Sequence, residues 1–184
     1  MEVPREWTDL LTRLSEVIGP VVLAGGALRD LDNGRQVKDL DFFVHAADQK
    51  AFVSMASRLR EAGFSLKHSM PAGSYLQGWT EEVVGLIDLS EGVGPNELPA
   101  QIVVINAPLS TVRERMDFGL CRISYDGYAV YRSYSYKHDV DNHTITLLRP
   151  GSNAQVRRSL KRYERLRQKY DWPLIDRVSE TAAE

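Results

Sequence analysis

Two aspartates one residue apart, Asp39 and Asp41, are the side chains in this sequence best suited to chemistry. The residues around them predict a β-strand over 39–44, and because side chains alternate across a strand, both carboxylates are expected on one face. Two carboxylates this close repel each other unless a cation lies between them, and such oxygen ligands suit Mg²⁺ bound to a triphosphate. The spacing therefore predicts a magnesium site, with Asp39 and Asp41 as metal ligands and catalytic residues.

A glycine pair, Gly25-Gly26, follows an apolar strand predicted over 21–24. Because glycine lacks a Cβ, the backbone there can approach a phosphate closely and offer N–H donors. A short helix predicted over 27–31 would direct its N-terminus to the same place, where the helix dipole favours anions. The alternative is a tight turn beside solvated carboxylates, which explains the glycines but leaves the two aspartates without a partner.

The order and spacing of these motifs resemble the catalytic head of the DNA polymerase β-like nucleotidyltransferases, and most closely the CCA-adding enzymes and bacterial poly(A) polymerases. That family carries a glycine pair followed by Arg-Asp and then an Asp-x-Asp strand; the matching segments here are Gly25–Asp30 and Asp39–Asp41. The resemblance is specific over residues 20–125 and loose elsewhere. It implies transfer of a nucleoside monophosphate from an NTP to a hydroxyl acceptor, with Mg²⁺ as cofactor and pyrophosphate as product.

Two cations near the motifs, Arg29 and Lys38, are expected to offset the charge of the bound phosphates. For Arg29 the alternative is a structural salt bridge with Asp30 or Asp39. The resemblance further implies that Arg115 and Asp117 help to hold the ribose and phosphates of the nucleotide. The alternative for this second pair is a solvated helix start.

A third carboxylate, which many members of the superfamily place on a neighbouring strand, is not evident in this sequence. Gln101 occupies the best position for it, but an amide is a poorer Mg²⁺ ligand than a carboxylate. Asp88 lies on another predicted strand and could substitute if that strand is adjacent. The site is therefore expected either to use two carboxylates or to bind nucleotide without efficient chemistry.

Residues 152–170 predict a basic amphipathic helix, in which seven cations accompany one acid. Its buried side is expected to consist of the apolar residues at helical spacing: Val156, Leu160, Tyr163, Leu166 and Tyr170. Arg158, Lys161 and Arg165 are the candidates for contact with a triphosphate or an RNA backbone. The alternative is a helix face that is merely solvated.

The succession of elements predicts an α/β (α+β) fold: a mixed-sheet, nucleotidyltransferase-type domain over 1–150, then a basic helix packed on it and a polar tail over 151–184. Helices are expected over 5–18 and 47–62, and strands over 83–89 and 101–106. Residues 128–148 predict a β-hairpin with a polar turn. Four tyrosines there could stack on bases, but packing within the sheet is the commoner cause: Tyr128, Tyr131, Tyr134 and Tyr136.

Composition limits the remaining choices. An apolar fraction of 43% over 184 residues suffices for one core, and a single cysteine, Cys121, excludes an internal disulfide. No signal pattern or membrane-spanning run is evident, so a cytoplasmic location is expected. A net charge of −2 gives no overall nucleic-acid footprint. An RNA 3′ end stays open as the acceptor through the helix over 152–170, and the resemblance to the superfamily leaves a small molecule or a protein open as well. The alternative class is a module that binds a nucleotide or a partner protein without efficient catalysis.

Overall fold

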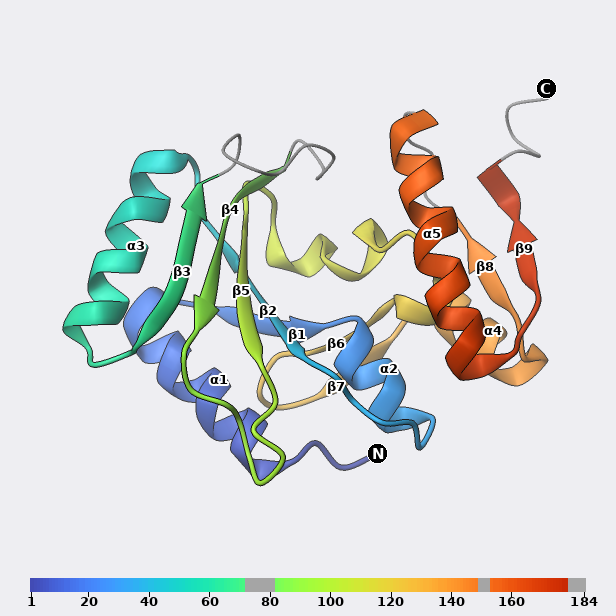
Figure 1. The fold of residues 1–184 in the computed structure, drawn as a ribbon, viewed down its shortest axis with the longest axis horizontal. Coiled ribbons are helices and arrows are strands. Elements are labelled where there is room, and N and C mark those ends of the chain that lie inside the picture. Colours follow the sequence, from blue (N-terminus) through green and yellow to red (C-terminus); the bar gives the residue numbers. More distant parts are fainter. Residues whose placement is uncertain (72–81, 149–152, 179–184) are drawn as a thin grey trace.

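The computed structural model describes residues 1–71, 82–148 and 153–178, in which a seven-stranded mixed sheet carries helices on it (Figure 1). The strand order is β3-β4-β5-β2-β1-β6-β7, and β2 and β5 are the parallel pair. The strands of this sheet are β1 (Val21–Ala24), β2 (Leu40–His45), β3 (Leu66–Pro71), β4 (Val83–Leu89), β5 (Ala100–Ile105), β6 (Ile123–Tyr125) and β7 (Val130–Arg132). The predicted mixed α/β sheet is confirmed.

Helices and short 3₁₀ turns connect these strands. They are α1 (Arg5–Ile18), α2 (Gly26–Asp32), α3 (Gln49–Glu61), α4 (Tyr134–Asn142), α5 (Asn153–Tyr170), η1 (Leu109–Thr111), η2 (Arg113–Arg115) and η3 (Gly119–Cys121). Local chemistry sets several of their ends. The side chain of Asp48 accepts a hydrogen bond from the Ala51 N–H at 2.8 Å and so caps α3, whereas α1 ends at Gly19, which has a positive φ of 87°.

One face of the sheet packs against α1 and α3 and forms the main core. Leu40, Phe42 and Val44 of β2 are fully buried there, as the alternation along this strand predicts. They lie in the same apolar cluster as Leu14 of α1 and Phe52 of α3. Every second side chain of β2, including Asp41, is thereby directed to the opposite face.

The opposite face is only partly covered. Val103 and Leu86 form a smaller apolar cluster there, and Val112 and Met116, from the segment that holds η1 and η2, pack onto it. Asp41 is half-buried on this face. The face that carries Asp41 therefore has apolar side chains over part of its area and polar side chains at one end of the strands.

Gly85 in β4 lies directly against the ring of Phe52, and a Cβ at this position would lie 2.5 Å from Phe52 Cε2. Because that ring is buried, Gly85→Ala should lower the free energy of unfolding by about 1–3 kcal/mol through overpacking. Urea unfolding followed by circular dichroism measures this loss. Adding Phe52→Leu should recover part of it, and an unchanged urea midpoint for Gly85→Ala would contradict the close packing.

The prediction of a β-hairpin over 128–148 is wrong, because the helix α4 lies between the two expected strands. Ser133 caps this helix by accepting a hydrogen bond from the Tyr136 N–H at 3.0 Å. The fully buried Asp139 then accepts hydrogen bonds from Thr144 Oγ1 and from the Thr146 N–H, both at 3.0 Å. These side-chain bonds to nearby groups favour a capped helix over a strand ladder. Instead, β8 (Ile145–Leu147) pairs in parallel with β9 (Leu174–Asp176) in a separate two-stranded sheet.

The tyrosines of this region divide into two groups. Tyr136 is buried and packs in the core, whereas Tyr128 is 96% exposed and Tyr134 is 84% exposed. Tyr131 is also exposed, and its hydroxyl donates to Asp126. Packing in the core therefore accounts for Tyr136 alone among the four, and this residue lies on α4 rather than on a strand of the sheet.

The basic helix α5 (Figure 1) packs on the sheet domain, as predicted. Its residues Leu166 and Tyr170 belong to the core cluster. Leu160 was predicted to be buried but is 40% exposed, and Ser159 takes the buried position instead. The reason is polar: Ser159 Oγ donates a hydrogen bond to Asp117 Oδ2 at 2.8 Å. The polar tail predicted after the helix forms β9 over part of its length. The predicted boundary between residues 150 and 151, and residues 179–184 of the tail, lie outside the described residues.

No helix within the described ranges has both the length and the apolar character needed to cross a bilayer.

Candidate active site

Asp39 and Asp41 line one cleft of about 300 Å³ on the partly covered face of the sheet. We call it the aspartate cleft, and its polar lining residues are Asp39, Asp41, Lys67, Asp88 and Gln101. Asp39 stands exposed just before β2, and Asp41 is the second residue of that strand. The structure thus brings the two aspartates of the motif to the same side of the sheet, opening into one space.

The cleft contains a row of polar side chains that crosses adjacent strands. Asp41 of β2 is in register with Gln101 of β5, and Gln101 is in register with Asp88 of β4. Gln101 Nε2 donates a hydrogen bond to Asp88 Oδ1 at 2.6 Å. Gln101 is therefore the direct neighbour of Asp41, while Asp88 lies one strand farther away, so β4 is not the adjacent strand that a substitute third carboxylate would require.

The environment of Asp41 disfavours its charge. Burial raises the pKa of Asp41 to about 6, the charges of Asp39 and Asp88 act in the same direction, and the charge of Arg162 opposes them. A carboxylate that is buried beside two others is stabilised when a cation binds. Three carboxylates line the cleft against one lysine, so its electrostatics favour the binding of a further cation.

The two carboxylates of the motif, Asp39 and Asp41, are suitable ligands for Mg²⁺. Mg²⁺ is commonly held by one or two carboxylates together with waters and the phosphates of a substrate, and Asp39 and Asp41 supply such oxygens. In the part of the chain that the structure describes, no group of three His, Cys, Asp or Glu side chains is placed to hold a metal. This also applies to the four polar residues around α4: His138, Asp139, Asp141 and His143.

The glycine pair lies next to this site on the opposite side of β2 and does not line the cleft. The antiparallel register of β1 with β2 pairs Leu23 with Phe42, so one step further places Ala24 beside Asp41. Gly25 has a positive φ of 82°, which favours glycine, and its N–H donates to the Ile123 carbonyl at 3.0 Å. The expectation that both glycines offer N–H groups to phosphate is therefore corrected: the N–H of Gly25 is used within the sheet.

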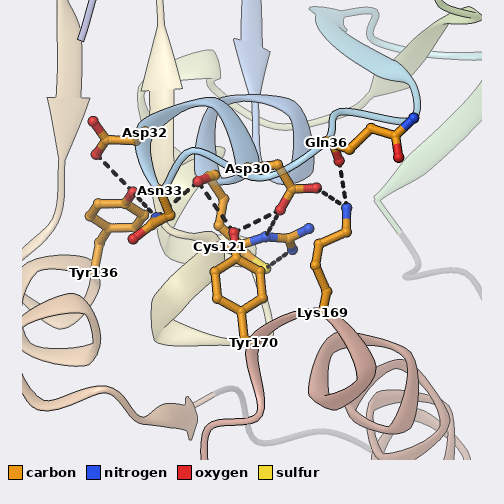
Figure 2. A network of polar contacts seen from close by, with 9 residues as sticks. Asp30, Asp32, Asn33, Gln36, Cys121, Tyr136, Lys169 and Tyr170 are labelled. Atoms are coloured by element: carbon orange, nitrogen blue, oxygen red, sulfur yellow. Dashed lines mark hydrogen bonds and ion pairs between the residues drawn. The ribbon is translucent and has the colours of Figure 1, made fainter.

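Arg29 is also placed differently from the expectation of a phosphate ligand. Its side chain is buried under α2, where Nε donates to Asp30 Oδ1 at 2.7 Å and Nη1 lies 3.2 Å from Cys121 Sγ. Lys169 and Tyr170 of α5 donate to the same Asp30 carboxylate (Figure 2). The structural salt bridge is thus the arrangement found, and this Arg-Asp pair fastens α5 to α2.

Lys38 and Arg115 contribute differently to the surroundings of the site. Lys38 is exposed directly before Asp39. Arg115 pairs with Glu82, and its Nε donates to Thr111 Oγ1 at 2.8 Å. The guanidinium of Arg115 is therefore engaged with these neighbours, in contrast to the expectation of a nucleotide contact, while Lys38 is exposed beside the aspartates.

Asp117 joins α5 to the site. Its Oδ2 accepts hydrogen bonds from Ser159 Oγ at 2.8 Å and from Arg162 Nη1 at 3.0 Å. Its Oδ1 is buried and finds no hydrogen-bond partner within the described part of the chain. Arg162 also stabilises the charged form of Asp41, so one arginine of α5 acts on both acids. This carboxylate oxygen therefore keeps unused acceptor capacity beside the arginine.

Other cations of α5 lie beyond the contact with Asp117. Lys161 and Arg165 are exposed and Arg158 is half-buried. Arg162, which the sequence did not single out, is the cation of this helix whose charge acts on Asp41. Arg162 pairs directly with Asp117, which Ser159 of the same helix also contacts. This pairing depends on tertiary contact, so no signal short of the packed structure identifies Arg162.

The chain is similar to known proteins in its fold but not at the level of sequence families. Neither the protein-family models nor the curated protein sequences give a match. Among solved structures, a tRNA-processing enzyme in apo form aligns with a TM-score of 0.65 at 19% identity over 98% of this chain and 46% of that one. The Thermotoga maritima CCA-adding enzyme complexed with tRNA gives 0.63 at 16% identity over 97% and 41%.

A CCA-adding enzyme in complex with ATP gives a TM-score of 0.63 at 19% identity, covering 92% of this chain and 39% of that one. The chain thus spans less than half the length of these enzymes. The similarity covers nearly all of the present chain, including α5, at identities that establish the fold alone. The chain therefore has a fold similar to part of these tRNA-processing and CCA-adding enzymes.

Proposed function

We propose that this protein is a metal-dependent nucleotidyltransferase that moves a nucleoside monophosphate from an NTP to the 3′ hydroxyl of an RNA, releasing pyrophosphate. The observation that carries the proposal is the pair Asp39 and Asp41 in one cleft, where burial and neighbouring acids raise the pKa of Asp41. The RNA acceptor is supported by the basic α5 and by the tRNA bound to one structural neighbour.

Asp39 and Asp41 would hold Mg²⁺, which when bound neutralises the triphosphate and increases the acidity of the attacking hydroxyl. In the reaction, the hydroxyl oxygen forms a bond to the α-phosphorus of the NTP. The bond from that phosphorus to the bridging oxygen breaks, pyrophosphate leaves with this oxygen, and the hydroxyl proton passes to water. The two aspartates would thereby hold the acceptor hydroxyl close to the α-phosphorus of the donor.

The donor NTP is assigned to the side of Asp41 that faces β1, α2 and α5. Arg162 supplies positive charge there, and Asp117 holds this arginine in place through a hydrogen bond. Lys38 and the backbone at Gly26 are the further groups that would contact the phosphates. Arg29 and Asp30 support this side indirectly, because they hold α5 in place.

An RNA acceptor predicts a measurable role for three cations of α5, of which two are exposed and one is half-buried. Replacing Arg158, Lys161 and Arg165 by alanine should weaken binding of single-stranded RNA and lower the slope of log K against log salt by about 2, since each lost phosphate contact contributes about 0.7. Fluorescence anisotropy over a salt series measures both. Binding of ATP with Mg²⁺, followed by calorimetry, should stay as in the wild type.

A matched control for this triple variant is Arg5→Ala with Arg13→Ala and Arg58→Ala, which removes cations of α1 and α3 on the other face. It should leave the salt slope unchanged. An unchanged RNA affinity in the α5 variant would direct the acceptor assignment to a small molecule or a protein.

A second candidate function is a module that binds a nucleotide or a partner protein without efficient catalysis. The observation in its favour is that Gln101, an amide, is the neighbour of Asp41 on β5. Incubation with each α-labelled NTP, Mg²⁺ and total RNA, and in parallel with total protein, separates the two. Labelled RNA supports the transferase, and NTP binding without any labelled product supports the module.

A further inference from the structure

The aspartate cleft continues well beyond the two aspartates, on the side of β2 away from the glycine turn. From Asp41 it crosses Gln101 and Asp88 and reaches Lys67 on β3. By contrast, β1 borders β2 on the other side, and α5 is fastened to α2, which follows β1. Asp41 therefore separates two regions: one toward β1 and α5, and one toward β5, β4 and β3.

The two regions differ in charge. Arg162 lies on the side of α5, where it favours the charged form of Asp41. The cleft on the other side is lined by Asp39 and Asp88 against one lysine, Lys67. A triphosphate is drawn to the first region and repelled by the carboxylates of the second. The second region is better suited to a group that brings hydroxyls rather than several negative charges.

The geometry of Gln101 and Asp88 gives this region a defined hydrogen-bonding character. An ionised carboxylate only accepts hydrogen bonds and an amide nitrogen only donates, so the 2.6 Å bond from Gln101 Nε2 to Asp88 Oδ1 fixes which way the amide is turned. Two further acceptor atoms, Gln101 Oε1 and Asp88 Oδ2, then belong to side chains that line the cleft. Neighbouring strands are about 4.8 Å apart, so both acceptors lie within about 10 Å of Asp41 along the row.

We propose that Gln101 and Asp88 form the acceptor subsite and read the terminal ribose of an RNA, accepting hydrogen bonds from its vicinal 2′ and 3′ hydroxyls. Asp88 has a second effect, because it holds the amide of Gln101 in the orientation that directs its oxygen to the ligand. Lys67, at the far end of the cleft, contacts the phosphate that precedes this ribose. The 2′ hydroxyl is what distinguishes RNA from DNA, so this pair makes the protein selective for an RNA end. The inference rests on the proposed function and specifies its acceptor site.

The test compares two labelled oligonucleotides: a single-stranded RNA, and the same RNA whose last nucleotide is 2′-deoxy. Their affinities for the NTP-free protein are measured by fluorescence anisotropy, so no turnover is needed. The wild type should prefer the ribose end by about tenfold, the effect of one hydrogen bond to a charged or well-oriented acceptor. Gln101→Leu and Asp88→Asn should each abolish this preference, and Gln101→Leu, which removes no charge, should leave the affinity for ATP with Mg²⁺ within about twofold of the wild type.

His68→Gln is the matched control, because His68 is the next residue of the same row beyond Asp88 and is exposed. It should keep the preference. The competing role for Gln101, a stand-in for a third metal ligand, predicts that Gln101→Glu tightens Mg²⁺ binding and raises turnover. In the acceptor role the same substitution places an unpaired carboxylate beside Asp88 and abolishes the preference for ribose.

Equal binding of the two oligonucleotides by the wild type, or an unchanged preference in both Gln101→Leu and Asp88→Asn, would overturn the acceptor subsite. The proposed transferase would survive either result if the wild type still adds labelled nucleotide to RNA. Conversely, a wild type that binds ribose ends selectively but transfers nothing to them would refute the transferase and keep the subsite. The two failures are therefore distinguishable in one set of measurements.

Discussion

Replacing Asp41 by Asn should reduce nucleotide transfer by about 10³-fold, equivalent to about 4 kcal/mol of transition-state stabilisation, while the melting temperature stays the same or rises. The loss follows from removing one of two carboxylates that would hold the metal. The gain in stability follows from burial and the neighbouring charges of Asp39 and Asp88, which raise the pKa of Asp41 and so make its ionised form unfavourable in the fold at neutral pH. Transfer is measured with labelled NTP, and melting by differential scanning fluorimetry.

Ligand-induced stabilisation separates a binding defect from a general one. ATP with Mg²⁺ should raise the melting temperature of the wild type. The same ligands should raise the melting temperature of Asp39→Asn or Asp41→Asn much less. Asp9→Asn is the matched control, because Asp9 is an exposed acid on α1, and it should behave as the wild type. An equal shift in all four proteins would show that the nucleotide binds away from the aspartate cleft.

The sequence predicted the centre of the fold because its signals there are local. Alternation along residues 39–44 identified the buried face of β2, and helical spacing identified α1 and α3. The same reasoning failed for 128–148, since the tyrosine-rich pattern resembled a strand. The competing signals were the cap at Ser133 and the buried acceptor Asp139, whose partners Thr144 and Thr146 become neighbours only after the chain folds back.

The site was predictable only in part for a similar reason. Asp39 and Asp41 are linked by strand geometry alone, so their common side follows from the sequence. Lys67 and Arg162 reach the site from elements far away in the chain, and their placement depends on the strand order and on the docking of α5. Arg29 shows the opposite error: its place in a recognised motif indicated phosphate binding, yet the fold uses it to support a helix.

That support predicts a large effect on stability. The carboxylate of Asp30 accepts hydrogen bonds from Lys169 and Tyr170 (Figure 2) and from Arg29. Burial alone would raise the pKa of Asp30, but these partners lower it. Asp30→Ala leaves the guanidinium of Arg29, only 10% exposed, without its carboxylate. The free energy of unfolding should fall by about 3–5 kcal/mol, the usual cost of removing one partner of a buried ion pair.

Two further substitutions, measured in the same way by urea unfolding, should lower the free energy of unfolding by smaller amounts. Asp9→Ala breaks an exposed pair with Arg5 on α1 and should cost less than about 0.5 kcal/mol. Lys169→Met removes one donor to Asp30 and keeps Arg29 paired, so it should cost about 1 kcal/mol. Because Asp30 connects α2 to α5, Asp30→Ala should also expose α5 to proteolysis before the rest of the chain and weaken ATP binding through Arg162. A stable Asp30→Ala variant with a protected α5 would show that the apolar contacts of Leu166 and Tyr170 hold the helix without the buried network.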